Sequence, residues 1–285
     1  MRKTLISCLA LGLFAAVNPL LAEVDSTHLA SVLAAQPEET RARYQYRHPM
    51  ETLEFFGIEA GMTVVEALPG GGWYTKILLL YLGSDGHLIG ADYAREMYPL
   101  FGFFSEEQLQ AKETWSEDFT ADAKEWAGDD GAQASAFVFG SMPDKLKGQA
   151  DAVVFIRALH NLARFEAEGG FLTAALRNAY DALKPGGMVG VVQHHARDDM
   201  PDDWASGRNG YLKRDFLIAR MEEAGFEFVA ASDINASAQD QPTEEDMVWR
   251  LPPTLATSRE DPALRAKMEA AGESNRMTLK FRKPL

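Results

Sequence analysis

The sequence predicts an α/β fold, a mostly parallel β-sheet of seven strands with helices on both faces. Two observations lead to this prediction. Residues 62–92 have the pattern of a strand, a glycine turn, an amphipathic helix and a second strand that ends in an acid, which is how a nucleotide-binding α/β domain begins. Residues 151–157 (DAVVFIR) are almost all apolar, as expected of a central parallel strand that is buried on both faces.

Helices are expected before the sheet begins. Leu29, Val32 and Leu33 form a short apolar stripe. Pro49 suits the first position of a helix that continues to residue 56, and Gly57 ends it because glycine adopts the left-handed conformation without steric cost. The first strand then covers residues 62–67, a helix covers 73–82, and the second strand covers 87–91.

The rest of the chain continues the alternation of helices and strands. Residues 93–131 mix aromatic and charged side chains, which predicts helices covering one face of the sheet. Further elements are expected as strands at 134–139, 151–157, 188–193, 226–232 and 277–282, and as helices at 170–183 and 212–224. The motif KPGG (184–187) ends the first of these helices and Gly225 ends the second. Residues 233–275 are too long for a hairpin loop, and we expect a flexible insertion or a lid over the site.

The first 22 residues have the pattern of a secretory signal peptide. Arg2 and Lys3 precede an apolar run at 5–17, and a cleavage site follows Ala22. We therefore expect an exported, periplasmic protein with no stable membrane insertion after signal removal. The chain then divides into a signal peptide (1–22), an N-terminal helical segment (23–57) and a main domain (58–285) that contains the insertion at 233–275.

Composition limits the partners and the chemistry. The net charge is −14, and removal of Arg2 and Lys3 would make it −16, so nucleic acid and anionic membranes are poor partners and a small-molecule substrate is favoured. Cys8 is the only cysteine and lies in the predicted signal. The mature chain would therefore have no disulfide, no cysteine nucleophile and no thiolate metal site, and we expect no metal. The oligomeric state is left open.

The glycine turn supplies the first candidate ligand-binding residues. Gly70, Gly71 and Gly72 follow the first strand, where they allow a ligand to approach the backbone and the N-terminus of the next helix. Glu66 stands at the carboxyl end of that strand, and Asp92, which follows the second strand, can accept hydrogen bonds from both ribose hydroxyls. The alternatives are an ordinary strand–helix turn for the glycines, a helix cap or ion pair for Glu66 and a surface turn for Asp92.

Residues 66–72 (EALPGGG) do not have the G-x-G-x-x-G spacing of dinucleotide-binding dehydrogenases. They resemble motif I of class I S-adenosylmethionine-dependent methyltransferases, and LKPGG (183–187) and AGF (224–226) resemble turns before strands five and six of that superfamily. Leu68 replaces the first glycine of the common motif, and Pro69 follows it.

The resemblance implies the class I methyltransferase fold for residues 58–285, with S-adenosylmethionine as cofactor. It implies that Glu66 binds the methionyl amine and that Asp92 binds the ribose. Tyr93 would stack on the adenine or merely pack, and Ser141 and Met142 would lie near the adenine.

Five motifs also resemble a bacterial family of predicted methyltransferases that often carry an export signal. These are RHP (47–49), PGGGWYT (69–75), RALHN (157–161), VWRLPP (248–253) and GESNRMTLKF (272–281).

Two histidines are the candidate catalytic residues. His160 follows strand four and His194 follows strand five, at the edge where a methyl acceptor would sit, and imidazole can accept a proton near neutral pH. The alternative is that they hydrogen-bond loops. His194 and His195 are neighbours on a strand and so point to opposite faces, which means that one of them faces the site and that they do not share a metal. Arg157 is a candidate partner for a carboxylate of cofactor or substrate.

Two segments are expected near this edge. By the resemblance, Arg47 and His48 would fold over the pocket, and residues 249–253 would anchor the insertion or form a lid edge. We expect S-adenosylmethionine-dependent methyl transfer to a small acceptor. The alternative is an exported, non-catalytic binding protein that keeps the nucleoside pocket. The glycine spacing argues against a nicotinamide oxidoreductase.

Overall fold

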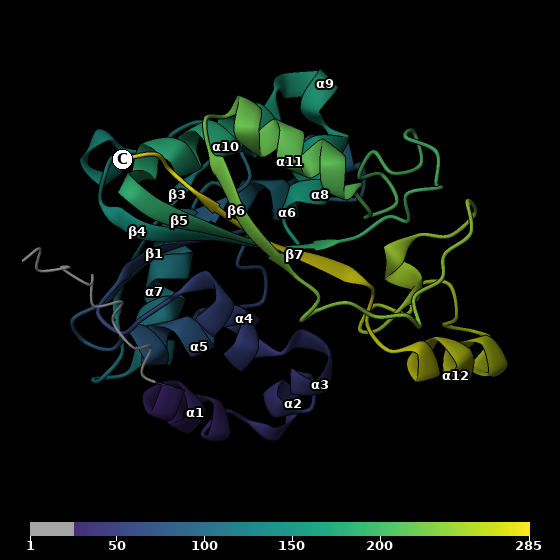
Figure 1. Cartoon of the computed structure of the whole chain (residues 1–285), viewed down its shortest axis with the longest axis horizontal. Helices are drawn as coiled ribbons and strands as arrows, with labels where there is room; N and C mark the ends of the chain where they lie inside the picture. Colours follow the sequence, from purple (N-terminus) through teal and green to yellow (C-terminus); the bar gives the residue numbers. More distant parts are fainter. Residues whose placement is uncertain (1–25) are drawn as a thin grey trace, which may run out of the picture.

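The computed structural model describes residues 26–285 and contains one seven-stranded sheet (Figure 1). The predicted signal peptide and its cleavage site lie outside the described residues. The strands are β1 (Thr63–Ala67), β2 (His87–Asp92), β3 (Gln133–Val138), β4 (Ala150–Ile156), β5 (Leu183–His194), β6 (Glu227–Ser232) and β7 (Arg276–Arg282). Their spatial order is β3-β2-β1-β4-β5-β7-β6. The predicted mostly parallel α/β sheet is therefore confirmed.

The strand order places a switch point at the centre of the sheet. Strands β1 to β5 are parallel, and β7 is antiparallel to both β5 and β6. The chain moves outward from β1 through β2 to β3 and then returns to the other side of β1 with β4. In open α/β sheets, ligands bind at the carboxyl ends of the strands beside such a reversal.

Within the described residues, four helices precede the sheet, in agreement with the predicted N-terminal helical segment. They are α1 (Ser26–Ala34), α2 (Glu38–Arg41), α3 (Tyr44–Arg47) and α4 (Pro49–Phe56). Pro49 occupies the first turn of α4, and Gly57 ends it with φ of 73°, as expected.

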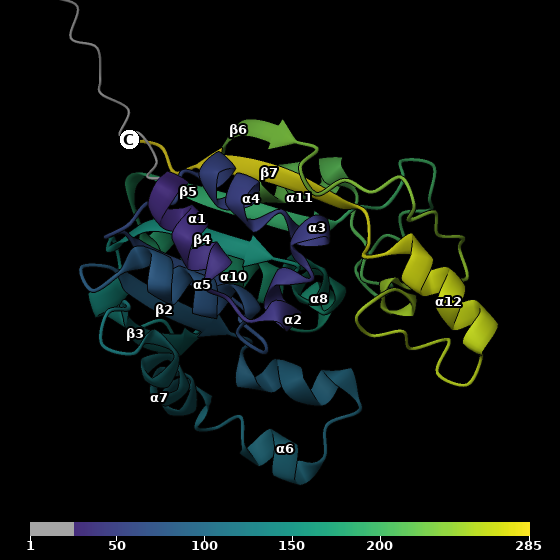
Figure 2. The same ribbon diagram turned by 90° about the horizontal axis from the view of Figure 1, so that it is seen from below.

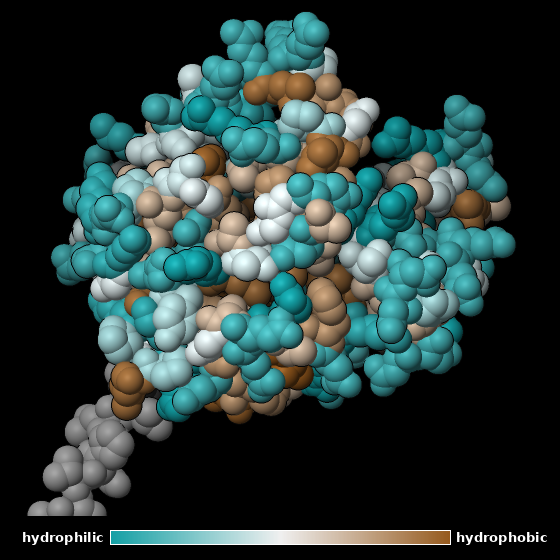
Figure 3. Space-filling view, turned by 90° about the horizontal axis from the view of Figure 1, so that it is seen from above, coloured by the Kyte–Doolittle hydropathy of each residue, from teal (hydrophilic) through white to brown (hydrophobic). Residues whose placement is uncertain are grey.

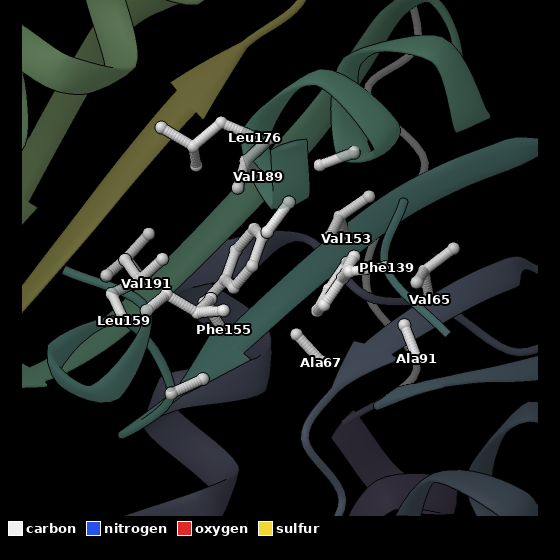
Figure 4. Close-up of a cluster of buried hydrophobic side chains, with 14 of the residues drawn as sticks. Val65, Ala67, Ala91, Phe139, Val153, Phe155, Leu159, Leu176, Val189 and Val191 are labelled. Carbon is white, nitrogen blue, oxygen red and sulfur yellow. The ribbon is translucent and has the colours of Figure 1, made fainter. Parts of the chain in front are cut away.

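Helices cover both faces of the sheet (Figure 1). One face packs against α1, α4, α5 (Trp73–Leu82) and α7 (Trp115–Ala127), and the other against α8 (Leu159–Arg164), α10 (Phe171–Ala182) and α11 (Arg214–Glu223). Each face has its own hydrophobic core, and neighbouring side chains of β1 point into different ones. Val64 packs in the first core, with α1, α4, α5 and α7, and Val65 packs in the second core, with α8, α10 and α11. Phe155 and Phe139 stack within the second core (Figure 4).

The region 93–131 covers the sheet less than predicted. Only α7 packs along β3 and α5, whereas η1 (Arg95–Phe101) lies beyond the end of β2, and α6 (Glu106–Gln110) has no buried residue. Figure 2 shows α6 well away from the strands. Tyr98, Phe101 and Phe104 pack on one another, whereas Phe119 of α7 packs in the core against the sheet.

The prediction that strand five begins at residue 188 was wrong. β5 begins at Leu183, directly after α10, and its KPGG segment is part of the strand because Leu183 pairs with Ala150 across an irregular register. The remaining boundaries differ from the predictions by one or two residues. Two further elements are short. η2 (Asp144–Leu146) precedes β4, and α9 (Glu166–Gly169) follows α8.

The insertion at 233–275 is mostly irregular and contains η3 (Val248–Arg250) and α12 (Pro262–Ala271). It forms a lobe at one end of the sheet, beside the carboxyl end of β5 (Figure 1). The face in Figure 3 is mainly hydrophilic, with hydrophobic residues in small separate groups. Within residues 26–285, the helices are too short or too polar to cross a bilayer.

Candidate functional site

A cavity of about 510 Å³ lies at the switch point. Its walls come from the turn after β1, the end of β4 with the start of α8, the end of β5, the N-terminal helices and the insertion. The sequence-predicted residues that line it are Gly70, Gly71, Arg47, Arg157, His160, Asn161, His194 and Trp249. Glu66, Gly72, Asp92 and Tyr93 lie outside its lining.

The glycine turn exposes its backbone to the cavity. Gly70 and Gly71 are solvent-exposed, and a side chain added at either would meet no atom closer than 3.9 Å. Gly72 has a different role, because it has φ of 75° and a Cβ there would lie 2.8 Å from the ring of Trp126. Leu68 also has a positive φ of 53°, a conformation that favours glycine, and it is one of the residues that line the cavity.

Glu66 is buried beneath this turn. It is 3% exposed and accepts a hydrogen bond of 2.7 Å from the Thr75 hydroxyl in α5. Burial raises the pKa of Glu66 to about 7, although the bonds from Thr75 act in the opposite direction. The side chain therefore changes charge near neutral pH.

Asp92 is already bonded on both carboxylate oxygens. The Tyr93 backbone N–H donates to Oδ1 at 2.9 Å, the Tyr98 hydroxyl donates to Oδ2, and the Lys112 ammonium lies 3.9 Å away. Burial raises the pKa of Asp92 despite these partners. Tyr98 belongs to η1, so the segment that sequence analysis expected on the sheet face instead covers the acid.

Tyr93 connects this acid to the cavity. Its hydroxyl accepts a hydrogen bond of 2.8 Å from the Asn161 side-chain amide, and its ring packs edge-on against Tyr98. Met142 packs against the core, while Ser141 is exposed. Neither Ser141 nor Met142 lines the cavity.

His160 and His194 face one another in the cavity wall, with ring centroids 5.3 Å apart. Nδ1 of His194 lies 2.6 Å from the Ser274 hydroxyl, and Nδ1 of His160 lies 3.4 Å from the amide nitrogen of Gln193. Within residues 26–285, no protein group bonds either Nε2. His195 does not line the cavity, so His194 alone of these two adjacent histidines borders it.

Both rings are held neutral. Burial, and more weakly the charge of Arg157, lowers the pKa of His160 to about 4. Burial, His160 and nearby arginines lower the pKa of His194 well below its usual value. At pH 7 each ring therefore offers Nε2 as a hydrogen-bond acceptor or as an N–H donor, according to its tautomer.

An ion-pair network that sequence analysis missed closes one side of the cavity. The Glu273 carboxylate binds Arg43, Arg47 and Arg276, joining the N-terminal helices to the end of the insertion. Arg276 also donates to the Tyr46 carbonyl at 2.9 Å. Burial tends to raise the pKa of Glu273, but the charges of these three arginines and of Arg157 outweigh it and lower the value to about 2. The motifs RHP and GESNRMTLKF, which contain Arg47 and Glu273, were the available signal, although they contain no indication of pairing across 226 residues.

The VWRLPP segment both anchors the insertion and borders the cavity. Arg250 is buried and binds Asp240 at 2.8 Å, and Trp249 packs on the small core formed around Trp204 and Tyr211. Trp249 also lies 5.9 Å from the His160 ring, centroid to centroid. Across residues 26–285, no group of three or more His, Cys, Asp and Glu side chains could hold a metal ion.

No family model and no curated protein sequence matches the chain, but solved structures match its fold. The [4+2]-cyclase SpnF superposes with a TM-score of 0.54 at 18% identity, covering 91% of this chain and 93% of its own. A chain of the Haloferax volcanii complex that contains the Trm112 methyltransferase activator gives 0.51 at 14% identity, covering 91% and 97%.

A third match is geranyl diphosphate C-methyltransferase from Streptomyces coelicolor A3(2), solved with Mg²⁺, geranyl diphosphate and S-adenosyl-L-homocysteine. It gives a TM-score of 0.51 at 16% identity, covering 89% of this chain and 87% of its own. Because one of these structures is a cyclase, the shared fold does not by itself fix a reaction. The chain has the class I methyltransferase fold, as the sequence predicted.

Proposed function

We propose that the protein transfers a methyl group from S-adenosylmethionine to a small-molecule acceptor. One observation carries the proposal. The cavity joins the glycine turn after β1 to the ends of β4 and β5, so one space borders both the expected cofactor turn and polar side chains suited to an acceptor. In open α/β sheets this edge is where ligands bind.

The residues of the turn fit the methionyl end of the cofactor. The backbone at Gly70 and Gly71 is exposed, with open space where a Cβ would stand. The cap residue Gly72 has no side chain to bind the first N–H groups of α5, and within residues 26–285 Glu66 bonds the backbone only at Thr75. The N–H groups of Trp73 and Tyr74 can therefore bind a carboxylate. Glu66 would then lie below the methionyl amine. The fit is supported further by the geranyl diphosphate methyltransferase of the same fold, which was solved with S-adenosyl-L-homocysteine.

The ribose end fits if one hydrogen bond is exchanged. Asp92 would hold the ribose hydroxyls and Tyr93 would lie beside the adenine. The Tyr98 hydroxyl occupies Oδ2 of Asp92, so the ribose would replace it or share that oxygen.

The chain's contribution to the reaction would be mainly alignment and exclusion of water. When bound, the cofactor would supply a methyl group on a sulfonium, which the acceptor's lone pair would take while the electrons of the broken bond remain on sulfur and any acceptor proton goes to water. His160 and His194 are neutral at pH 7 and would orient an acceptor O–H or N–H through Nε2. Trp249 and residues 251–254 would limit the access of water.

The acceptor is proposed to be small because the cavity is about 510 Å³ and because a net charge of −14 opposes binding of nucleic acid. Export to the periplasm is proposed from the first 22 residues alone. An exported enzyme would need cofactor in that compartment, or would have to bind it before export.

Calorimetric titration of the purified protein with S-adenosylmethionine and S-adenosylhomocysteine tests the proposal. Asp92→Ala should weaken both by about tenfold or more, because it removes hydrogen bonds to a charged acceptor. Asp85→Ala is the matched control, since Asp85 is an exposed acid just before the opposite end of β2. Failure of the folded protein to bind either compound would refute the cofactor assignment. Tight binding without methyl transfer to any component of an extract would favour a non-catalytic binding protein.

A further inference from the structure

The wall of the cavity is strongly basic. Four guanidinium groups line it, and we call them the arginine cluster: Arg43, Arg47, Arg157 and Arg276. Among residues 26–285, no aspartate or glutamate lines the cavity. This local excess contrasts with the net charge of −14 for the whole chain, so it is not a consequence of general composition.

One buried carboxylate balances only part of that charge. Glu273 binds Arg43, Arg47 and Arg276. Four positive groups and one negative group leave a formal charge of +3 around a partly enclosed space. A low-dielectric wall strengthens the attraction of such charges for an anion.

Arg157 is the member of the cluster with no protein partner. Within residues 26–285 its guanidinium makes no hydrogen bond or ion pair, although the side chain is only partly exposed. Burial and the repulsion of Arg47 and Arg276 lower the pKa of Arg157 to about 9, so it remains charged at pH 7. Cations placed in this way are normally paired.

The backbone holds Arg157 in place at a steric cost. Its φ is 59°, in the left-handed region that non-glycine residues rarely adopt. Its N–H donates to the Val192 carbonyl at 2.6 Å, which ties it to β5. Strained residues that the surrounding structure holds in this way are concentrated at functional sites.

We infer that the cavity binds a small organic anion, a carboxylate or a phosphate ester, and that Arg157 holds its charged group with the rest of the arginine cluster around it. A guanidinium suits both groups because its planar fork can donate two parallel hydrogen bonds. The identification of this anion as the methyl acceptor rests on the proposed function, whereas the anion site itself does not.

The cofactor does not account for this charge. S-adenosylmethionine carries a sulfonium and an ammonium against one carboxylate, so its binding would increase the positive charge of the site by one. The N–H groups of Trp73 and Tyr74 at the start of α5 already offer a position for its carboxylate. The charge of Arg157 is therefore available to a second ligand, beside His160 and Asn161.

Calorimetry with defined probes tests the inference. Sodium phosphate and sodium succinate would be titrated at constant ionic strength into the purified protein, with and without S-adenosylhomocysteine, and neutral succinamide would serve as the uncharged probe. We expect at least one anion, and not succinamide, to bind. Arg157→Gln should weaken that binding by about tenfold or more. Phosphate alone would indicate a phosphate ester, and succinate alone a carboxylate.

The controls separate charge from folding and anion from cofactor. Arg282→Gln removes the same charge from an exposed ion pair with Glu227, at the other end of β7 from Arg276, and should bind like the wild type. If Arg157→Gln does not fold, Arg157→Lys decides: binding several-fold weaker than the wild type supports the site, and unchanged binding contradicts it.

The inference is overturned if neither anion binds, or if Arg157→Gln binds anions as the wild type does. It is also overturned if Arg157→Gln loses only S-adenosylhomocysteine binding, since Arg157 would then serve the cofactor. Anion binding through Arg157 in a protein that ignores S-adenosylhomocysteine would keep the anion site and reject the proposed methyl transfer.

Discussion

Replacement of Glu273 by glutamine should destabilise the protein in a pH-dependent manner. The carboxylate is 2% exposed and is the shared partner of Arg43, Arg47 and Arg276. The arginines lower its pKa from 4.5 to about 2. Each factor of ten in proton affinity corresponds to about 1.4 kcal/mol, so the ionised side chain contributes about 3 kcal/mol. This agrees with the roughly 3–5 kcal/mol lost when one member of a buried ion pair is removed.

The sign of the pH dependence follows from the lowered pKa. A carboxylate whose pKa is lower in the folded protein stabilises it above about pH 4.5, and that contribution is lost as the pH falls through about 2. Urea denaturation of wild type and Glu273→Gln at pH 7, 5, 4 and 3 would give the difference in unfolding free energy. We expect about 3 kcal/mol at pH 7 and a decreasing difference below about pH 4.5.

Glu269→Gln is the matched control for this substitution, because it makes the same chemical change at a nearby exposed position. Glu269 pairs with Arg265 on the surface of α12, and its loss should change stability by less than about 1 kcal/mol. A difference for Glu273→Gln that is below about 0.5 kcal/mol, or that does not change with pH, would refute the account of this network. Glu273→Gln should also bind phosphate or succinate more tightly than the wild type, because the arginine cluster loses the carboxylate that pairs with three of its members.

The other predictions concern the buried acid Glu66, the Tyr98 hydroxyl on Asp92 and the histidines. Burial raises the pKa of Glu66 to about 7, so the stability that its protonated form gives is fully present below about pH 4.5 and is lost as the pH rises through about 7. In urea denaturation, Glu66→Gln should therefore be more stable than wild type by up to about 3 kcal/mol at pH 8. The two proteins should show no difference in stability at pH 4. An equal difference at both pH values would contradict the raised pKa. Tyr98→Phe removes the hydroxyl that competes for Asp92, and calorimetry should show S-adenosylhomocysteine binding strengthened by about 1 kcal/mol; weaker binding would mean that the hydroxyl supports the site. His160 should remain neutral from pH 8 to about pH 5.5, because its pKa is about 4, and NMR of its ring C–H should show no titration in that range; a midpoint near about 6.5 would contradict the described burial.

Much of the fold could be predicted because local patterns coincide with burial. The apolar run at 151–157 became the central strand β4, and the proline and glycine around 49–57 delimited α4 as expected. The start of β5 could not be predicted in this way. The KPGG motif has the composition of a turn, but pairing with β4 extends the strand through it, and pairing partners are not visible in a local pattern.

The site could be predicted only where one element positions a residue by itself. Gly70, His160 and His194 line the cavity because the ends of parallel strands meet at one edge of the sheet. The cover that Tyr98 forms over Asp92 depends on the path of an irregular segment. The pairing of Arg43 with Glu273 depends on how the insertion folds back on the N-terminal helices, and the sequence carries no periodicity that encodes such a contact.

A crystal structure of the protein with S-adenosylhomocysteine bound would test the central claim most directly. The account predicts the ribose on Asp92, the methionyl end on the backbone of Gly70 and Gly71, and the sulfur directed into the cavity toward His160 and Arg157. Density for the ligand at any other place, or a ligand whose ribose lies away from Asp92, would contradict the proposed methyl transfer.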